Sequence, residues 1–285
     1  MPCWVDTSQP DPEAAANFYR DLFGWEVENA MPADSPMKYF IGRIRGGDVA
    51  AVGSQSEGSP PVPTWNTYIW VDSVDATAEQ VKAAGGQVLM DPMDVMDAGR
   101  MAAFGDPEGA VFFGWQPKNH KGSQVVNEHG SVTSNDLNTR DLESAKAFYG
   151  AVFGWTVFGG GGGLMWQLPG YADHLEQINP GFKQGITEAG APEGFGDVVA
   201  FINPITNDQP DMGAHWSVRF AVDDADAAAQ KTTELGGQVV VPPFDAPWVR
   251  HTVLQDPQGA TFTASKFVPE NASLAAPAGS TADAA

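Results

Sequence analysis

The sequence has few cysteines, few basic residues and no long hydrophobic run. Its single cysteine, Cys3, excludes an internal disulfide and a thiolate metal cluster. We interpret Cys3 as a small buried residue of a first strand rather than as a nucleophile. No apolar run approaches the ~18 residues of a membrane helix, and the first residues lack the basic and apolar regions of a secretory signal. We therefore expect a cytoplasmic protein with no membrane partner.

Basic residues are outnumbered, with 15 Lys and Arg against 36 Asp and Glu and a formal net charge of −21. Such a surface repels phosphate backbones, so we expect no nucleic-acid partner. Hydrophobic residues make up 42% of the chain, which is enough for ordinary buried cores. At ~100–200 residues per domain, the 285 residues predict two domains.

The chain repeats its own landmarks in the same order. The segment 11–19, which begins with Asp and ends with Phe-Tyr, matches 141–149 at an offset of 130, and a Phe-Gly-Trp follows each copy. A Val-Asp segment and a Gly-Gly pair recur at an offset of 151, and an Asp-Pro-x-Gly turn recurs at 150. The second copy therefore carries about 21 extra residues (151 minus 130), which we place within 157–204.

Each landmark has a local structural meaning. Asp11 and Asp141 suit helix N-caps, and Gly24 and Gly154 suit the left-handed residue that ends a helix. A short strand precedes each capped helix and several strands follow it. We expect a linker at 119–128 and a disordered tail at 269–285, where the sequence is mostly Ala, Pro, Ser, Gly and Thr.

Taken together, these motifs resemble the vicinal oxygen chelate superfamily, which includes glyoxalase I, bleomycin-resistance proteins and extradiol dioxygenases. The segments 168–176 and 196–200 narrow the resemblance to tandem two-domain bacterial proteins described as hydroxylase-like or glyoxalase-like. The resemblance implies an α+β fold with two fused glyoxalase-like domains, at 1–118 and 129–268. Each domain would pair two βαβββ modules into a curved half-barrel sheet around a cavity.

The resemblance also implies where a divalent metal would be held, by His and Glu side chains. Those positions fall on Trp4, Asn66 and Phe113 in the first copy, and on Ser134, Ser217 and Thr263 in the second. None is His or Glu, so we expect no metal and no other cofactor. A register shift of two would bring Asp6, Asp136 or His215 to these positions, which leaves an unconventional metal site open in the second cavity.

Two side chains are the candidate catalytic residues, Asp136 and His215, since a carboxylate in an apolar pocket and an imidazole can both transfer protons. His251 is a further candidate for proton transfer, with a structural role as the alternative. We expect a ligand to be bound by Ser134, Ser217, Thr263, Trp216, Tyr171, His174, Asp6 and Asn66.

The second cavity is the expected functional one, because Trp4 and Phe113 take up volume in the first. The insertion, with five glycines at 159–163, is interpreted as a lid or as a tolerated surface loop.

Three functions remain open. The first is a metal-independent enzyme, of a tailoring hydroxylase type, acting on a small aromatic or polyketide-like molecule. The second is a drug- or metabolite-binding protein, and the third is a metal-dependent lyase or dioxygenase. In each case the partner is a small molecule, and the chain is a monomer or a homodimer.

Overall fold

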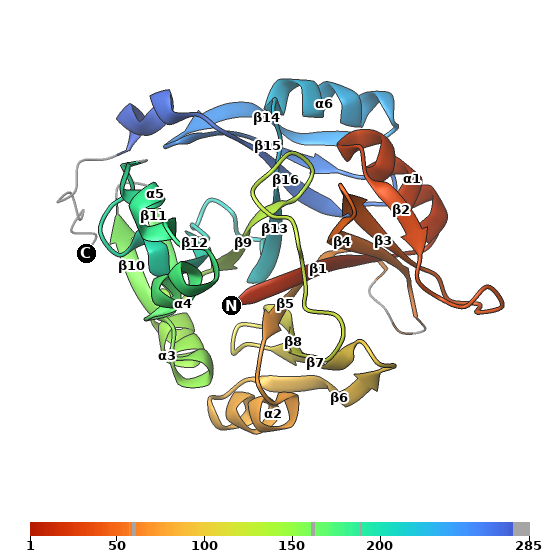
Figure 1. Cartoon of the computed structure of the whole chain (residues 1–285), viewed down its shortest axis with the longest axis horizontal. Helices are drawn as coiled ribbons and strands as arrows, with labels where there is room; N and C mark the ends of the chain where they lie inside the picture. The colour runs from red at the N-terminus through yellow and green to blue at the C-terminus, as the bar shows by residue number, and fades with distance from the viewer. Residues whose placement is uncertain (57, 59–60, 161–162, 189, 276–285) are drawn as a thin grey trace.

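Strands and helices alternate to build two eight-stranded mixed sheets, one in each half of the chain (Figure 1). The computed structural model describes residues 1–56, 58, 61–160, 163–188 and 190–275. The first domain contains β1 (Pro2–Gln9), α1 (Pro12–Phe23), β2 (Glu26–Asn29), β3 (Tyr39–Ile44), β4 (Gly47–Ser54), β5 (Trp65–Trp70), α2 (Val74–Ala83), β6 (Gln87–Val95), β7 (Gly99–Gly105) and β8 (Val111–Pro117).

The second domain repeats this order with an insertion before its fourth strand. It contains β9 (Val132–Thr139), α3 (Leu142–Phe153), β10 (Thr156–Gly160), β11 (Gly163–Gln167), α4 (Tyr171–Ile178), α5 (Phe182–Glu188), the 3₁₀ turn η1 (Phe195–Asp197), β12 (Val198–Pro204), β13 (His215–Ala221), α6 (Ala225–Glu234), β14 (Gln238–Ala246), β15 (Val249–Gln255), β16 (Thr261–Phe267) and the 3₁₀ turn η2 (Pro269–Leu274).

Each sheet joins two βαβββ modules, as the sequence predicts. The strand orders are β2-β3-β4-β1-β5-β8-β7-β6 and β10-β11-β12-β9-β13-β16-β15-β14. The two modules meet where the first strands of each module pair antiparallel, β1 with β5 and β9 with β13. The α+β fold of paired βαβββ modules is confirmed.

The helix ends follow the predicted chemistry. Asp11 accepts a hydrogen bond from the backbone N–H of Ala14 at 3.0 Å, and Asp141 does the same for Ser144 at 2.9 Å. These bonds satisfy N–H groups that have no partner inside the helix. Gly24 and Gly154 end α1 and α3 with φ of 73° and 69°, a conformation that favours glycine.

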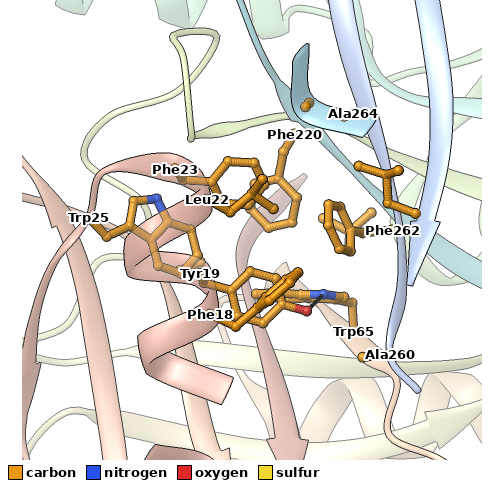
Figure 2. Close-up of a cluster of buried hydrophobic side chains, with 14 of the residues drawn as sticks. Phe18, Tyr19, Leu22, Phe23, Trp25, Trp65, Phe220, Ala260, Phe262 and Ala264 are labelled. Carbon is orange, nitrogen blue, oxygen red and sulfur yellow. Dashed lines mark hydrogen bonds between the residues drawn. The ribbon is translucent and has the colours of Figure 1, made fainter. Parts of the chain in front are cut away.

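The helices pack across the domain boundary. Figure 2 shows Tyr19 and Phe23 of α1 against Phe220 of β13 and Phe262 of β16. A second cluster joins α2 and the first sheet to α3, β11 and β12 of the second domain. Both hydrophobic cores are therefore shared by the two halves of the chain.

One polar contact recurs at each of these cores. The hydroxyl of Tyr19 donates to Asp256 at 2.8 Å, and the Trp65 indole donates to Tyr19 at 3.0 Å. The counterpart in the other core has Tyr149 donating to Asp106 at 3.0 Å and Trp216 donating to Tyr149 at 2.9 Å. The helix tyrosine of each domain thus binds the Asp-Pro-x-Gly turn of the other.

The predicted insertion is only partly irregular. Gly159 and Gly160 belong to β10 and Gly163 to β11, so the described part of the glycine run forms a hairpin rather than a lid, while 161–162 lie outside the described residues. The added segment is α4, α5 and η1, which contact one another. Likewise, η2 occupies the start of the predicted disordered tail, and 276–285 lie outside the described residues.

Within the described residues, no helix is both long and apolar enough to cross a membrane.

Candidate functional site

Each sheet has one face covered by helices and one face turned away from them, which we call the inner face. On the first sheet Trp4 lies opposite Tyr68, which lies opposite Phe113, so the three share the inner face. Trp4 and Tyr68 form a buried cluster with Trp115, and Phe113 packs against it. His120, from the segment after β8, lies edge-on to Trp4 with ring centroids 4.4 Å apart. Aromatic rings therefore fill the inner face of the first domain.

Asp6 is enclosed within this aromatic cluster. Its carboxylate accepts hydrogen bonds from the hydroxyls of Tyr39 and Tyr68 and from the Asn66 amide, each at 2.9 Å. Burial raises the pKa of Asp6, and the three donors oppose that shift. Asp6 is only 5% exposed, and both of its carboxylate oxygens already accept hydrogen bonds from side chains of the first domain.

The inner face of the second sheet is polar. Asp136 lies opposite Ser217, while Arg219 lies between Ser134 on one neighbouring strand and Thr263 on the other. The register therefore places these five side chains on one face. The sequence motifs predict four of them there, and Arg219 is the fifth.

Arg219 is the centre of a hydrogen-bonded cluster. One terminal nitrogen forms an ion pair with Asp136, and the other lies 3.2 Å from Nε2 of His251. The guanidinium also lies over the Phe201 ring, with Cζ 5.1 Å from the centroid. Ser134 donates to Asp136 at 2.7 Å and Asn203 donates to it at 3.4 Å. We call Asp136, Arg219 and His251, with Phe201 beneath, the Arg219 cluster.

His251 is a neutral imidazole in this setting. Burial is the main cause that lowers its pKa to about 4, and the positive charge of Arg219 lowers it further. Because a guanidinium only donates, Nε2 of His251 must accept from it, and the ring proton is then assigned to Nδ1. Nδ1 is buried and has no hydrogen-bond partner among the described residues.

Comparison of equivalent positions explains why the two faces differ. Trp4, Tyr68, Met101 and Phe113 of the first domain correspond to Ser134, Arg219, His251 and Thr263 of the second, at the offsets of the sequence repeat. Tyr39, which lies opposite Gly53 in the first sheet, donates to Asp6, whereas Asn203 of β12 donates to Asp136 in the second. Small and polar residues thus replace the rings that enclose Asp6, although the aspartate itself is present in both domains.

Two of the predicted site residues lie elsewhere than expected. The Trp216 side chain is only 6% exposed and packs in the core shared with α3, away from the inner face on which the sequence predicts it. Neighbouring residues on a strand point to opposite faces, and Trp216 therefore cannot share a face with Ser217. His215 is near the start of β13, where its Nδ1 lies 2.8 Å from the Gly213 carbonyl, and no described contact joins it to Asp136.

Tyr171 and His174 line a different surface. They border a groove of about 720 Å³ that also includes Trp70 and Gln80 of the first domain and Trp155 of the second. The groove runs between the domains along α2 and α4. The structure thus separates these two residues from the Arg219 cluster.

Arg219 is the functional candidate that sequence reasoning missed. The family's metal positions call for His and Glu side chains, and an arginine does not bind metal. The available signal was its place in β13, two residues after Ser217 and therefore on the same face. Nothing in the sequence links the candidate His251 to Asp136.

The residues present do not fit a divalent metal. The family's positions hold Trp4, Asn66 and Phe113 in one domain and Ser134, Ser217 and Thr263 in the other. Among the described residues no group of three or more His, Cys, Asp and Glu side chains is placed to hold an ion. The carboxylate on the second inner face is already paired with a guanidinium, whose charge repels a cation.

Comparisons with known proteins agree with this fold. A family model described as the Glyoxalase/Bleomycin resistance protein/Dioxygenase superfamily matches residues 4–112 and 130–263. "Putative glyoxylase CFP32" of Mycobacterium tuberculosis is 40% identical over 273 residues, which are 94% of this chain and 95% of that protein. "Anthracycline biosynthesis protein DnrV" of Streptomyces peucetius is 34% identical over 277 residues, which are 92% of this chain and 91% of that protein.

Solved structures are similar in fold at much lower identity. A Mn(II)-bound glyoxalase from Novosphingobium aromaticivorans has a TM-score of 0.56 at 16% identity, covering 93% of this chain and 81% of that one. The 2,3-dioxygenase LapB from Pseudomonas sp. KL28 has a TM-score of 0.54 at 12% identity, covering 93% and 91%. At these identities the likeness concerns the fold alone.

Proposed function

This chain belongs to the glyoxalase, bleomycin-resistance protein and dioxygenase superfamily, and from that premise we propose that it acts on a small fused-ring aromatic molecule at the inner face of its second domain. One observation carries the proposal: the equivalent aspartates differ in their surroundings, since Asp6 is enclosed by tyrosines in the first domain and Asp136 is held by Ser134, Asn203 and Arg219 in the second. A binding site needs a few placed polar groups, and the second face has them.

The ligand class rests on two supports. Phe201 presents an aromatic ring beside the guanidinium of Arg219, and planar ligands stack well on such a surface. The relative DnrV carries a name that places it in anthracycline biosynthesis, and anthracyclines are fused-ring aromatic polyketides. We extend that ligand class to this chain.

The contacts of Asp136 suggest its role in the site. Ser134 occupies one carboxylate oxygen, and Arg219 and Asn203 occupy the other. A carboxylate held by three donors has little free capacity to take a proton from a ligand. We propose that Asp136 positions Arg219 rather than acting as the base, and that His251, not His215, is the histidine that contacts the ligand.

We also propose that the function needs no metal ion, because the side chains at the metal positions are poor ligands or none at all. The test is elemental analysis of purified, tag-free protein, followed by ligand binding in the presence of EDTA. We expect substoichiometric metal and unchanged affinity. One tightly held transition metal per chain, together with loss of binding in EDTA, would contradict the proposal.

Alizarin, a dihydroxyanthraquinone, is a suitable probe for the site, and its affinity can be measured by equilibrium dialysis with EDTA present. Ser134→Trp introduces into the second domain the residue that the first domain has at the same position, Trp4. We expect the wild type to bind alizarin and Ser134→Trp to lose at least about tenfold in affinity, because an indole fills the face.

The matched control is Tyr68→Phe, which alters the equivalent face of the first domain and should leave affinity unchanged. Failure of the wild type to bind, or loss of binding in Tyr68→Phe alone, would place the function elsewhere. Mass spectrometry of the recovered ligand then separates two outcomes, since a converted ligand indicates an enzyme and an unchanged one indicates a sequestering protein.

A further inference from the structure

The Arg219 cluster has more hydrogen-bond donors than acceptors. Of the six buried side-chain polar atoms without a partner in the described part of the chain, two are Nε of Arg219 and Nδ1 of His251. The other four are on Gln9, His120, Trp166 and Thr232, outside this cluster. Nε of arginine is always a donor, and Nδ1 of His251 is a donor because Nε2 accepts from Arg219.

The cluster cannot satisfy these two donors by itself. Both oxygens of Asp136 already accept hydrogen bonds, from Ser134 on one side and from Arg219 and Asn203 on the other. His251 is only 8% exposed, so its unpaired nitrogen is poorly reached by solvent. Buried donors in native proteins nearly always have an acceptor, which points to one that arrives from outside the chain.

An exposed aromatic ring borders the cluster. Phe244 on β14 lies edge-on to His251, with ring centroids 5.8 Å apart, and is itself 42% exposed. β14 is an edge strand, and its pairing with β15 is irregular between Val241 and Phe244. Rotation of an exposed ring is a small change of the kind that often accompanies binding.

We propose that oxygen atoms of the ligand which only accept hydrogen bonds, such as ring carbonyls or an ionised phenol, bind Nε–H of Arg219 and Nδ1–H of His251. This assignment rests on the proposed function and adds the chemical group that the site recognises. The ligand's ring system would then lie by Phe201 and Phe244, the aromatic side chains of the cluster and its rim. A ligand whose oxygens are all alcohols gains less, since its hydroxyl hydrogens find no free acceptor in a cluster whose carboxylate oxygens are already occupied.

His251 variants provide the sharpest test. The side-chain amide of asparagine can place its N–H near the position of Nδ1, whereas leucine has no donor. We expect His251→Leu to weaken alizarin binding about tenfold or more and His251→Asn to return it to within about threefold of the wild type. A side chain needed only for packing would show the reverse order, because leucine fills apolar space better.

Arg219→Lys tests the other donor. It keeps a positive charge beside Asp136 but has no N–H at the Nε position, so we expect about tenfold weaker binding of alizarin. Thermal unfolding of each variant shows whether it folds.

The colour of bound alizarin distinguishes a ring carbonyl from an ionised phenol as the oxygen that the cluster binds. If the held oxygen is an ionised phenol, the bound dye changes colour at a lower pH than the free dye; if it is a ring carbonyl, that pH does not fall.

The outcomes separate this inference from the proposed function. If Ser134→Trp abolishes alizarin binding while His251→Leu and Arg219→Lys bind like the wild type, the site is correct and the oxygen assignment is wrong. If the wild type binds no alizarin, or Ser134→Trp has no effect, both fail. Weak binding by His251→Leu together with recovery in His251→Asn supports both.

Discussion

Asp136 and Arg219 place opposite charges in a position where solvent reaches 5% of one side chain and 14% of the other. Removing one partner of such a pair leaves the other charge buried without compensation. Asp136→Asn should therefore lower the free energy of unfolding by about 3–5 kcal/mol.

The double variant Asp136→Asn with Arg219→Met removes both charges, so it should lose clearly less stability than the sum of the single variants. Urea denaturation of all four proteins measures the coupling. Strictly additive losses would mean that the two charges do not stabilise each other.

His251 makes stability depend on pH in a defined window. Its pKa is lowered to about 4 in the folded chain, against about 6.5 in an unfolded chain. Between these values the unfolded chain binds a proton that the folded chain does not, so the free energy of unfolding falls as pH falls. The full loss is about 3 kcal/mol once the pH reaches the folded value.

The control for this effect is His251→Asn, which has no titrating group at that position. Its stability relative to the wild type should improve as the pH is lowered from 7 to 4.5, as measured by urea denaturation at each pH. Parallel curves for the two proteins would show that His251 does not titrate in this window.

Among the elements, α1 and α3 have equivalent roles at the domain boundary. Tyr19→Phe removes one hydrogen bond to Asp256, and Tyr149→Phe removes one to Asp106. Each change leaves a buried carboxylate with one donor fewer, so we expect losses of about 1–3 kcal/mol in the free energy of unfolding. The rings remain in place, and alizarin affinity should not change.

The same contacts explain what the sequence could and could not reveal. The Phe-Tyr and Asp-Pro-x-Gly landmarks that exposed the repeat bind one another across the domain boundary, so they report on the fold and not on chemistry. Strand alternation placed Ser134, Asp136 and Ser217 on one face correctly.

Arg219 and His251 could not be joined in the same way. They lie on strands separated by β16, and only the folded register brings them together. The α4–α5 insertion was located in the sequence, but the surface it borders depends on packing between domains.

At the scale of the whole molecule, the two cores that pack beneath the helices are each built from both halves. One cluster combines Phe18 and Trp65 of the first domain with Phe220 and Phe262 of the second, and the other combines Phe112 with Phe148. A chain of residues 1–126 alone should therefore aggregate or unfold without a cooperative transition, because about half of each core is exposed.

Co-expression of 127–285 should recover a soluble complex with the unfolding behaviour of the intact chain. Gel filtration and thermal unfolding of the separate and combined halves measure this. A monomeric and cooperatively folded 1–126 would show that the first domain is stable by itself.

The sharing of cores also has a consequence in time. Helix α1 is made early, while the strands that cover Phe23 come near the end of the chain. At about 5–20 residues per second, roughly ten to fifty seconds pass between the synthesis of Phe23 and that of Phe262. Throughout that interval the growing chain presents aromatic side chains that have no partner yet, so its yield in a cell should depend on how well chaperones shield the nascent first half.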